Sequence, residues 1–114
     1  MEVFNQTRNA PLITQGRLAN SFWSRLRGLL GAAPLLKGEG LILAGEKSVH
    51  TFFMSFPIDV LYVNKEYKVI RADANMVPYR IGPFLAQSEY VLELPVGTIA
   101  ATATQTGDQL RFEA

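Results

Sequence analysis

Short hydrophobic runs, each bounded by glycine, proline, asparagine or charged residues, recur along most of the chain. Such runs are typical of β-strands joined by tight turns. The predicted strands cover residues 3–7, 12–18, 41–43, 49–54, 58–63, 68–74 and 89–94, with a last short strand ending near Phe112. Turn-forming residues fill the stretches 8–11, 64–67, 95–98 and 106–109. The pattern predicts a mainly β fold that begins with a hairpin at a sheet edge.

Two of these strands differ in the burial that their patterns predict. Residues 58–63 are apolar on both faces except at Asp59, which is typical of a central strand covered on both sides. Residues 89–94 alternate in polarity, so we expect one face of that strand to meet solvent. The stretch from about 76 to 87 has no clear period, and irregular connections of this length often carry function.

One segment has the period of an amphipathic helix. Asn20 or Ser21 can cap its start and Gly31 can end it. Its apolar face comprises Phe22, Trp23, Leu26, Leu29 and Leu30. Together with the strands, this segment predicts an all-β sandwich or barrel-like domain with one short amphipathic helix near the N-terminus, covering an open end.

Length and composition narrow the class of protein. At 114 residues, 48% hydrophobic and 18% charged, the chain is expected to form one domain over residues 1–114 and to fold without staples. The absence of cysteine excludes disulfides, thiolate metal sites and cysteine nucleophiles. No serine-nucleophile elbow is present to support nucleophilic catalysis. No phosphate-binding or dinucleotide loop is present either, and no cofactor is expected.

Charge and hydropathy limit the partners. Eleven basic against ten acidic side chains give a formal net charge of +1, which disfavours nucleic acid. Gly31 and Pro34 interrupt the longest apolar run, so no membrane span is expected. The polar N-terminus lacks a signal peptide, which predicts a cytoplasmic protein or, if a signal peptide was removed, an exported one. We expect a monomer or weak homodimer with a small-molecule or protein partner.

The stretch Ser-Val-His-Thr-Phe-Phe-Met-Ser-Phe-Pro-Ile-Asp-Val at residues 48–60 resembles the uncharacterised proteins of the domain of unknown function 192 family, also called uncharacterised protein family 0127. The resemblance also includes residues 25–31, 38–41, 90–95, 97 and 107–108. It implies a compact, mostly β domain with a short helix near its start, and it brings no activity, substrate or cofactor. Similar sequences often carry a Pro-Cys pair where this chain has Ala-Gly-Glu-Lys at 44–47, which removes any role for a thiol beside the histidine.

His50 is the only histidine of the chain, and on an extended strand it shares a face with Phe52 and Met54. This placement favours a partly buried ring whose nitrogens bond to backbone or to a carboxylate. The alternative is a proton shuttle or a metal ligand. Because no metal-ligand spacing accompanies this single histidine, we expect no metal site.

Asp59 interrupts an otherwise apolar strand, and a buried carboxylate must be paired or heavily hydrogen-bonded. Backbone amides at the Pro57 bend would satisfy it, and so would an arginine such as Arg25, Arg27 or Arg80. The alternative is a pocket carboxylate that meets a ligand.

Tyr79 and Arg80, in the irregular connection, form a natural pair for an anionic or sugar-like ligand, because the ring can stack and the guanidinium offers a fork of donors. The alternative is a solvated loop pair. We therefore predict a non-catalytic small-ligand or protein binding module with Tyr79, Arg80 and His50 as ligand-binding residues. A first alternative is an enzyme using His50 and Asp59 as general acid and base, and a second is a structural or assembly subunit.

Overall fold

The computed structural model describes residues 1–19, 34–49, 51 and 54–114. The strands within these residues are β1 (Glu2–Asn5), β2 (Ala10–Ile13), β3 (Gln15–Ala19), β4 (Glu39–Ala44), β5 (Ile58–Val63), β6 (Val69–Met76), β7 (Tyr90–Pro95) and β8 (Leu110–Glu113). The helix within them is α2 (Thr98–Thr102). The described part of the chain is therefore mainly β.

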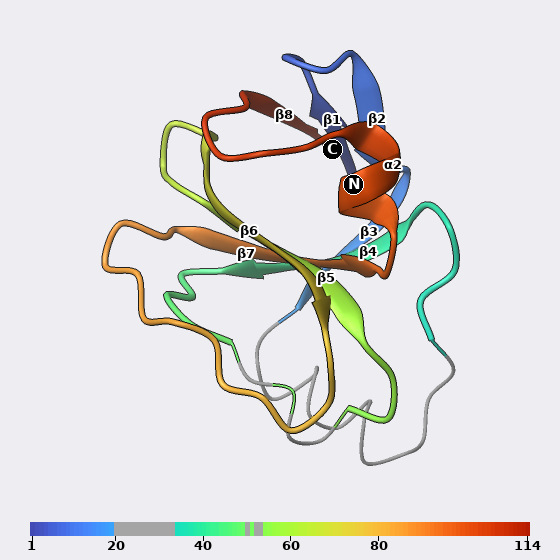
Figure 1. Ribbon diagram of the computed structural model, residues 1–114. Helices are drawn as coiled ribbons and strands as arrows, with labels where there is room; N and C mark the ends of the chain where they lie inside the picture. Colours follow the sequence, from blue (N-terminus) through green and yellow to red (C-terminus); the bar gives the residue numbers. More distant parts are fainter. Residues whose placement is uncertain (20–33, 50, 52–53) are drawn as a thin grey trace.

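The strands form two sheets (Figure 1). The smaller sheet has the order β2-β1-β8, so the first and last strands of the chain lie side by side. The larger sheet has the order β3-β4-β7-β5-β6, and only β3 and β4 within it are parallel. Among the described residues β3 and β6 remain edges of this sheet, so the barrel is not closed.

The two faces of the larger sheet have different cover. The smaller sheet and α2 lie over one face, which we call the helix face, and irregular connections lie over the other, which we call the loop face (Figure 1). Successive residues of a strand point to opposite faces. Leu61 and Val63 of β5 accordingly join the cluster that includes Ile99 of α2. Val60 and Tyr62 join a second cluster on the loop face.

Several predicted elements are confirmed. β1 and β2 form the expected antiparallel hairpin, and β2 is an edge strand. All six residues of β5 are buried, as expected of a strand covered on both faces. The turn between β5 and β6 lies at the predicted residues, where the Asn64 side-chain oxygen accepts hydrogen bonds from the Glu66 and Lys68 amides at 3.0 and 2.9 Å.

Three strand predictions are wrong. Residues 12–18 do not form one strand, because the chain turns at Thr14 and passes from β2 in one sheet to β3 in the other. Within 49–54, the described residues 49, 51 and 54 are not in a strand. β7 is not half exposed, because it lies between β4 and β5 and its residues 91–94 are buried on both faces.

The predicted helix at residues 21–31 lies outside the described residues. The helix that the structure does describe, α2, is near the C-terminus rather than the N-terminus and follows a stretch predicted as a turn. α2 has five residues, and its N-cap is Gly97 in the left-handed region with no capping side chain of its own. No helix in the described part of the chain has the length and apolar character needed to cross a membrane.

Candidate functional site

Thr51 attaches the irregular connection after β6 to the loop face. Its side chain is buried, and its hydroxyl donates to the Val77 carbonyl at 2.7 Å and accepts from the Arg80 amide at 2.9 Å. Its amide donates to the Arg80 carbonyl at 2.8 Å, and its carbonyl accepts from the Tyr79 amide at 3.0 Å. Four hydrogen bonds to one residue therefore hold the backbone of residues 77–80 in place.

Residues 80–85 continue this attachment, and we call them the covering segment. The Gly82 amide donates to the Val49 carbonyl at 2.7 Å, and the Leu85 amide donates to the Lys47 carbonyl at 2.8 Å. The Ser48 hydroxyl adds a bond to the Gly82 carbonyl at 3.2 Å. The covering segment thus runs beside residues 47–49, where the stretch 48–60 that resembles the family begins.

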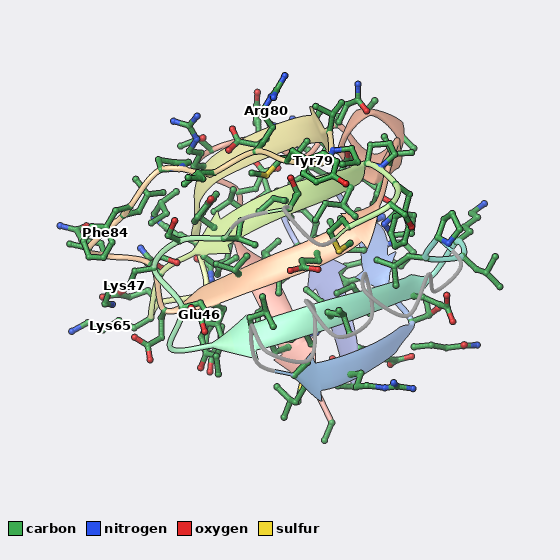
Figure 2. The ribbon with its side chains drawn as sticks, turned by 90° about the horizontal axis from the view of Figure 1, so that it is seen from below. Glu46, Lys47, Lys65, Tyr79, Arg80 and Phe84 are labelled. Atoms are coloured by element: carbon green, nitrogen blue, oxygen red, sulfur yellow. The ribbon has the colours of Figure 1, made fainter. Side chains whose placement is uncertain are left out.

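The side chains on this attached backbone are exposed. Tyr79 and Ile81 are each 70% exposed, and Phe84 is 72% exposed. Arg80 is exposed too, and no carboxylate among the described residues forms an ion pair with it. Figure 2 shows the Arg80 side chain extending away from the body of the molecule. We call residues 77–84 the candidate binding face.

The structure places two of the three predicted ligand-binding residues together. Tyr79 and Arg80 bond through their backbones to Thr51, directly after position 50. Tyr79 has a φ of 63°, in the left-handed region that non-glycine residues seldom adopt. Strained backbone of this kind is enriched at functional sites. His50 itself lies outside the described residues.

Asp59 lies on the other side of the sheet and is completely buried. Its Oδ2 accepts hydrogen bonds from the amides of Gly97 at 3.1 Å and Ile99 at 2.8 Å, at the start of α2. Its Oδ1 accepts from the Asn75 amide at 2.8 Å. The carboxylate is bonded to backbone amides, although not to those of the Pro57 bend, and it caps a helix that lacks a capping side chain of its own.

Tyr62 is the residue that sequence reasoning missed. Its side chain is buried on the loop face, and within the described part of the chain its hydroxyl is the one buried side-chain polar atom without a hydrogen-bond partner. Burial, together with the charge of Asp73, raises the pKa of Tyr62 to about 12. The sequence did contain a clue to Tyr62. Its hydroxyl lies within an apolar strand and needs a hydrogen-bond partner there, just as the Asp59 carboxylate does.

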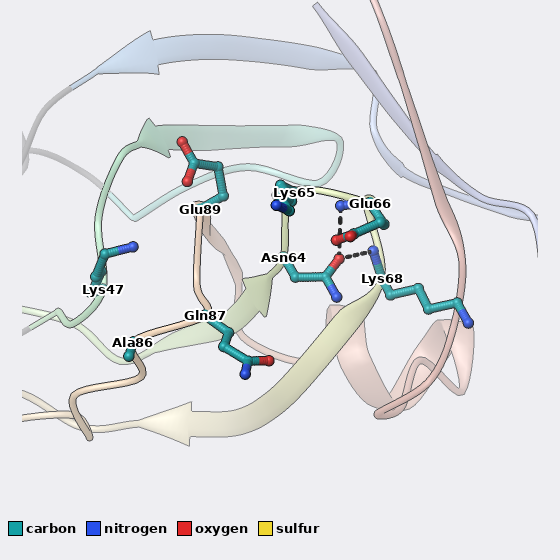
Figure 3. A pocket seen from close by; sticks show the side chains of 8 residues that line it. All are labelled: Lys47, Asn64, Lys65, Glu66, Lys68, Ala86, Gln87 and Glu89. Carbon is teal, nitrogen blue, oxygen red and sulfur yellow. Dashed lines mark hydrogen bonds between the residues drawn. The ribbon is translucent and has the colours of Figure 1, made fainter.

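A polar cavity of about 670 Å³ opens beside the covering segment (Figure 3). Its lining consists of Lys47, Asn64, Lys65, Glu66, Lys68, Ala86, Gln87 and Glu89. The Lys47 ammonium group is engaged, because it donates to the Ser88 carbonyl at 2.8 Å. Both signs of charge line the cavity, so its lining does not select an anion or a cation.

A second, more apolar cavity of about 800 Å³ lies beside α2. Leu36 and Val96 are the exposed apolar residues of its lining. Tyr79 and Arg80 line neither this cavity nor the polar one. The part of the chain that the structure describes also contains no cluster of three or more side chains able to hold a metal ion.

These features define a class of protein: a small, mainly β domain in which a buried threonine attaches an irregular, partly apolar connection to one face of a five-stranded sheet. A family model described as "Uncharacterized ACR, COG1430" matches residues 3–112. The chain therefore belongs to the domain of unknown function 192 family.

Relatives from archaea match nearly the whole chain. The UPF0127 protein PH1112 of Pyrococcus horikoshii is 28% identical, with 96% of this chain and 97% of that protein covered. A UPF0127 protein of Thermococcus sibiricus is 27% identical, with 97% of this chain and 74% of that protein covered. The names of these relatives state no activity.

Two solved structures share the fold. A protein of unknown function from Novosphingobium aromaticivorans has a TM-score of 0.77 at 22% identity, covering 97% of this chain and 82% of that one. A putative transcription regulator from Sinorhizobium meliloti has a TM-score of 0.72 at 22% identity, covering 96% and 89%. At this identity the likeness concerns the fold alone.

Proposed function

We propose that the protein is a non-catalytic binding module and that residues 77–84 are its binding face. The observation that carries this proposal is the attachment of an exposed, partly apolar segment to the buried Thr51 by four hydrogen bonds. Single exposed apolar residues are common on protein surfaces. Three large ones within six residues, on an irregular connection that is hydrogen-bonded to the loop face, are typical of a surface that meets a partner.

The chemistry of this face supports a ligand with an anionic group beside a flat or apolar one. The Tyr79 ring and the Arg80 guanidinium are neighbours in sequence, and both side chains are exposed. Tyrosine offers a rigid amphipathic contact area, and arginine offers paired donors to a carboxylate or phosphate. Because Thr51 holds the backbone at Tyr79 and Arg80 before binding, little conformational entropy of these two residues remains to be lost. Both a small molecule and a protein segment fit this description.

A ligand screen with matched variants tests the proposal. The unlabelled probes are aromatic carboxylates, sugar acids and short acidic peptides carrying an aromatic residue, titrated into isotope-labelled protein and followed by amide NMR shifts. We expect shifts to cluster on residues 77–84 and to disappear in Arg80→Ala/Ile81→Ala. The control is Arg17→Ala/Leu18→Ala, because these residues form a similar exposed cationic and apolar pair on the edge strand β3.

Binding that is equal in the two double variants would contradict the proposal, and so would shifts confined to the polar cavity around Lys47 and Lys65. The enzyme alternative, with His50 and Asp59 as general acid and base, stays a hypothesis, because position 50 lies outside the described residues. The assembly alternative predicts instead that the same NMR shifts appear on raising the protein concentration without a probe.

A further inference from the structure

The hydroxyl of Tyr62 points at the backbone of the covering segment. A Cβ added to Gly82 would lie 2.3 Å from this hydroxyl oxygen and 3.1 Å from the Val49 carbonyl oxygen. Gly82 is therefore the residue that lets the covering segment close over Tyr62. A side chain at position 82 would force the Tyr62 hydroxyl or the covering segment to shift.

Closing the covering segment leaves the Tyr62 hydroxyl without a partner. It is bonded to no protein atom, although a hydroxyl can both donate and accept. A buried polar group without a partner loses the hydrogen bonds that water would give it, which weakens the closed state by roughly 5- to 100-fold in its equilibrium constant. The amides of Gly82 and Leu85 both form hydrogen bonds, so this weakening of the closed state comes from the Tyr62 hydroxyl and not from them.

The attachment of the covering segment is uneven along its length. Residues 77–80, which lead into the segment at Arg80, are held by the hydrogen bonds of Thr51, and the segment beyond Arg80 is held by the amides of Gly82 and Leu85 and the hydroxyl of Ser48. Ile81 and Phe84 are largely exposed, so their apolar side chains add little to the closed state, whereas the half-buried Leu85 packs against the loop-face cluster at the end of the segment. The middle of the segment, at Gly82 over Tyr62, is therefore held by hydrogen bonds to its backbone with little apolar packing from Ile81 and Phe84.

We infer that residues 80–85 form a lid that opens from the loop face and brings the Tyr62 hydroxyl to solvent. The start of the lid stays attached at Thr51, and the bonds that break on opening are those from Gly82 to Val49, from Leu85 to Lys47 and from Ser48 to Gly82. This further step rests on the proposed function: in the ligand-bound protein, the hydroxyl bonds to a polar atom of the ligand beside Tyr79 and Arg80. Local openings of this kind are common in ligand-binding loops.

Native-state amide hydrogen exchange on the ligand-free protein tests the lid. We expect the Gly82 and Leu85 amides to exchange about tenfold or more faster than the amides of β5 and β7, with little dependence on low denaturant concentrations. In Tyr62→Phe the closed state no longer buries a hydroxyl without a partner, so the Gly82 and Leu85 amides should exchange roughly tenfold more slowly than in the parent.

A second variant tests the contact itself. Gly82→Ala should speed the exchange of the Leu85 amide, because the added methyl group collides with the Tyr62 hydroxyl, and Tyr62→Phe in the same chain should restore slower exchange. If Gly82→Ala does not fold, the Tyr62→Phe comparison decides alone. The lid is refuted if the Gly82 and Leu85 amides exchange as slowly as those of β5 and β7, or if Tyr62→Phe speeds their exchange. No ligand is used, so failure of the proposed binding face leaves this outcome unchanged.

Discussion

Asp59 and Tyr62 are three residues apart on β5, both are buried, and they point to opposite faces of the same sheet. On the helix face, three backbone amides bond the Asp59 carboxylate. On the loop face, the Tyr62 hydroxyl has no partner. Buried polar groups are nearly always hydrogen-bonded, so the first arrangement is what stability requires and the second is an exception.

The difference separates a face with a structural role from the face that carries the candidate binding residues. The helix face joins the two sheets and α2 through a buried cluster that contains residues of both sheets, and Asp59 completes it by capping α2. The loop face carries the irregular segments, the strained Tyr79 and the exposed Ile81 and Phe84. Regions that move or bind are drawn from the less stable parts of a fold, which favours the loop face as the site of function.

The largest effect is expected from Asp59→Asn. In the parent protein, both side-chain oxygens of Asp59 accept hydrogen bonds from backbone amides. In the variant, the NH₂ group that replaces one oxygen would face an amide N–H, which is also a donor. Losing charged acceptors from buried amides should lower the free energy of unfolding by about 2–4 kcal/mol, measured by denaturant unfolding. The control is Asp73→Asn, which breaks an exposed pair with Arg71 and should cost under about 1 kcal/mol. An Asp59→Asn protein that unfolds like the parent would remove the structural role.

The next largest effect is a decrease in the free energy of unfolding at alkaline pH that depends on Tyr62. Its pKa is about 12 in the folded protein and about 10 when unfolded. The folded state therefore holds the Tyr62 proton more tightly than the unfolded state does. The contribution of this group to stability is fully present below pH 10, and it is lost as the pH rises toward 12 because the unfolded state ionises first. The loss should reach about 2–3 kcal/mol at pH 12 relative to Tyr62→Phe, measured by urea unfolding of both proteins across this range. Parallel curves for the two proteins would show that the hydroxyl is solvated.

A smaller effect is expected from Thr51→Val, which keeps the shape of the side chain and removes the hydroxyl. The Val77 carbonyl and the Arg80 amide then lose a partner, and the free energy of unfolding should fall by about 1–2 kcal/mol. The Arg80 amide should also exchange faster with solvent. Thr51→Ser, which keeps the hydroxyl, is the matched control and should protect the Arg80 amide like the parent. Equal exchange in the two variants would mean that the Thr51 hydroxyl does not hold the candidate binding face.

Local patterns predicted the parts of the fold that depend on neighbouring residues. The continuous apolar run of β5 and the Asn64 turn were both found, because burial on two faces and a side-chain-to-backbone turn leave a signal within a few residues. α2 was missed because it is short and Asp59, its capping carboxylate, lies 40 residues from Ile99. β7 was predicted as half exposed because Glu93 alternates with apolar residues, and yet Glu93 is buried between two neighbouring strands.

The candidate site shows the same division. Tyr79 and Arg80 could be selected from the sequence because they stand in a long irregular connection. Thr51 could not be selected as their anchor, because its partners Val77 and Arg80 lie 26 and 29 residues away. Tyr62 was counted among apolar residues, and only the packing of Gly82 against its hydroxyl shows that the polar end of the side chain matters.

By itself, the sequence determined that this is a mainly β protein of the domain of unknown function 192 family, with a buried strand at residues 58–63 and an irregular connection after residue 76. The tertiary structure alone decided which buried polar groups are satisfied. Asp59 finds three amides and Tyr62 finds none, although both interrupt the same apolar run. The physical reason is that a hydrogen-bond partner depends on distance in space, and the partners of a buried strand come from segments far away along the chain.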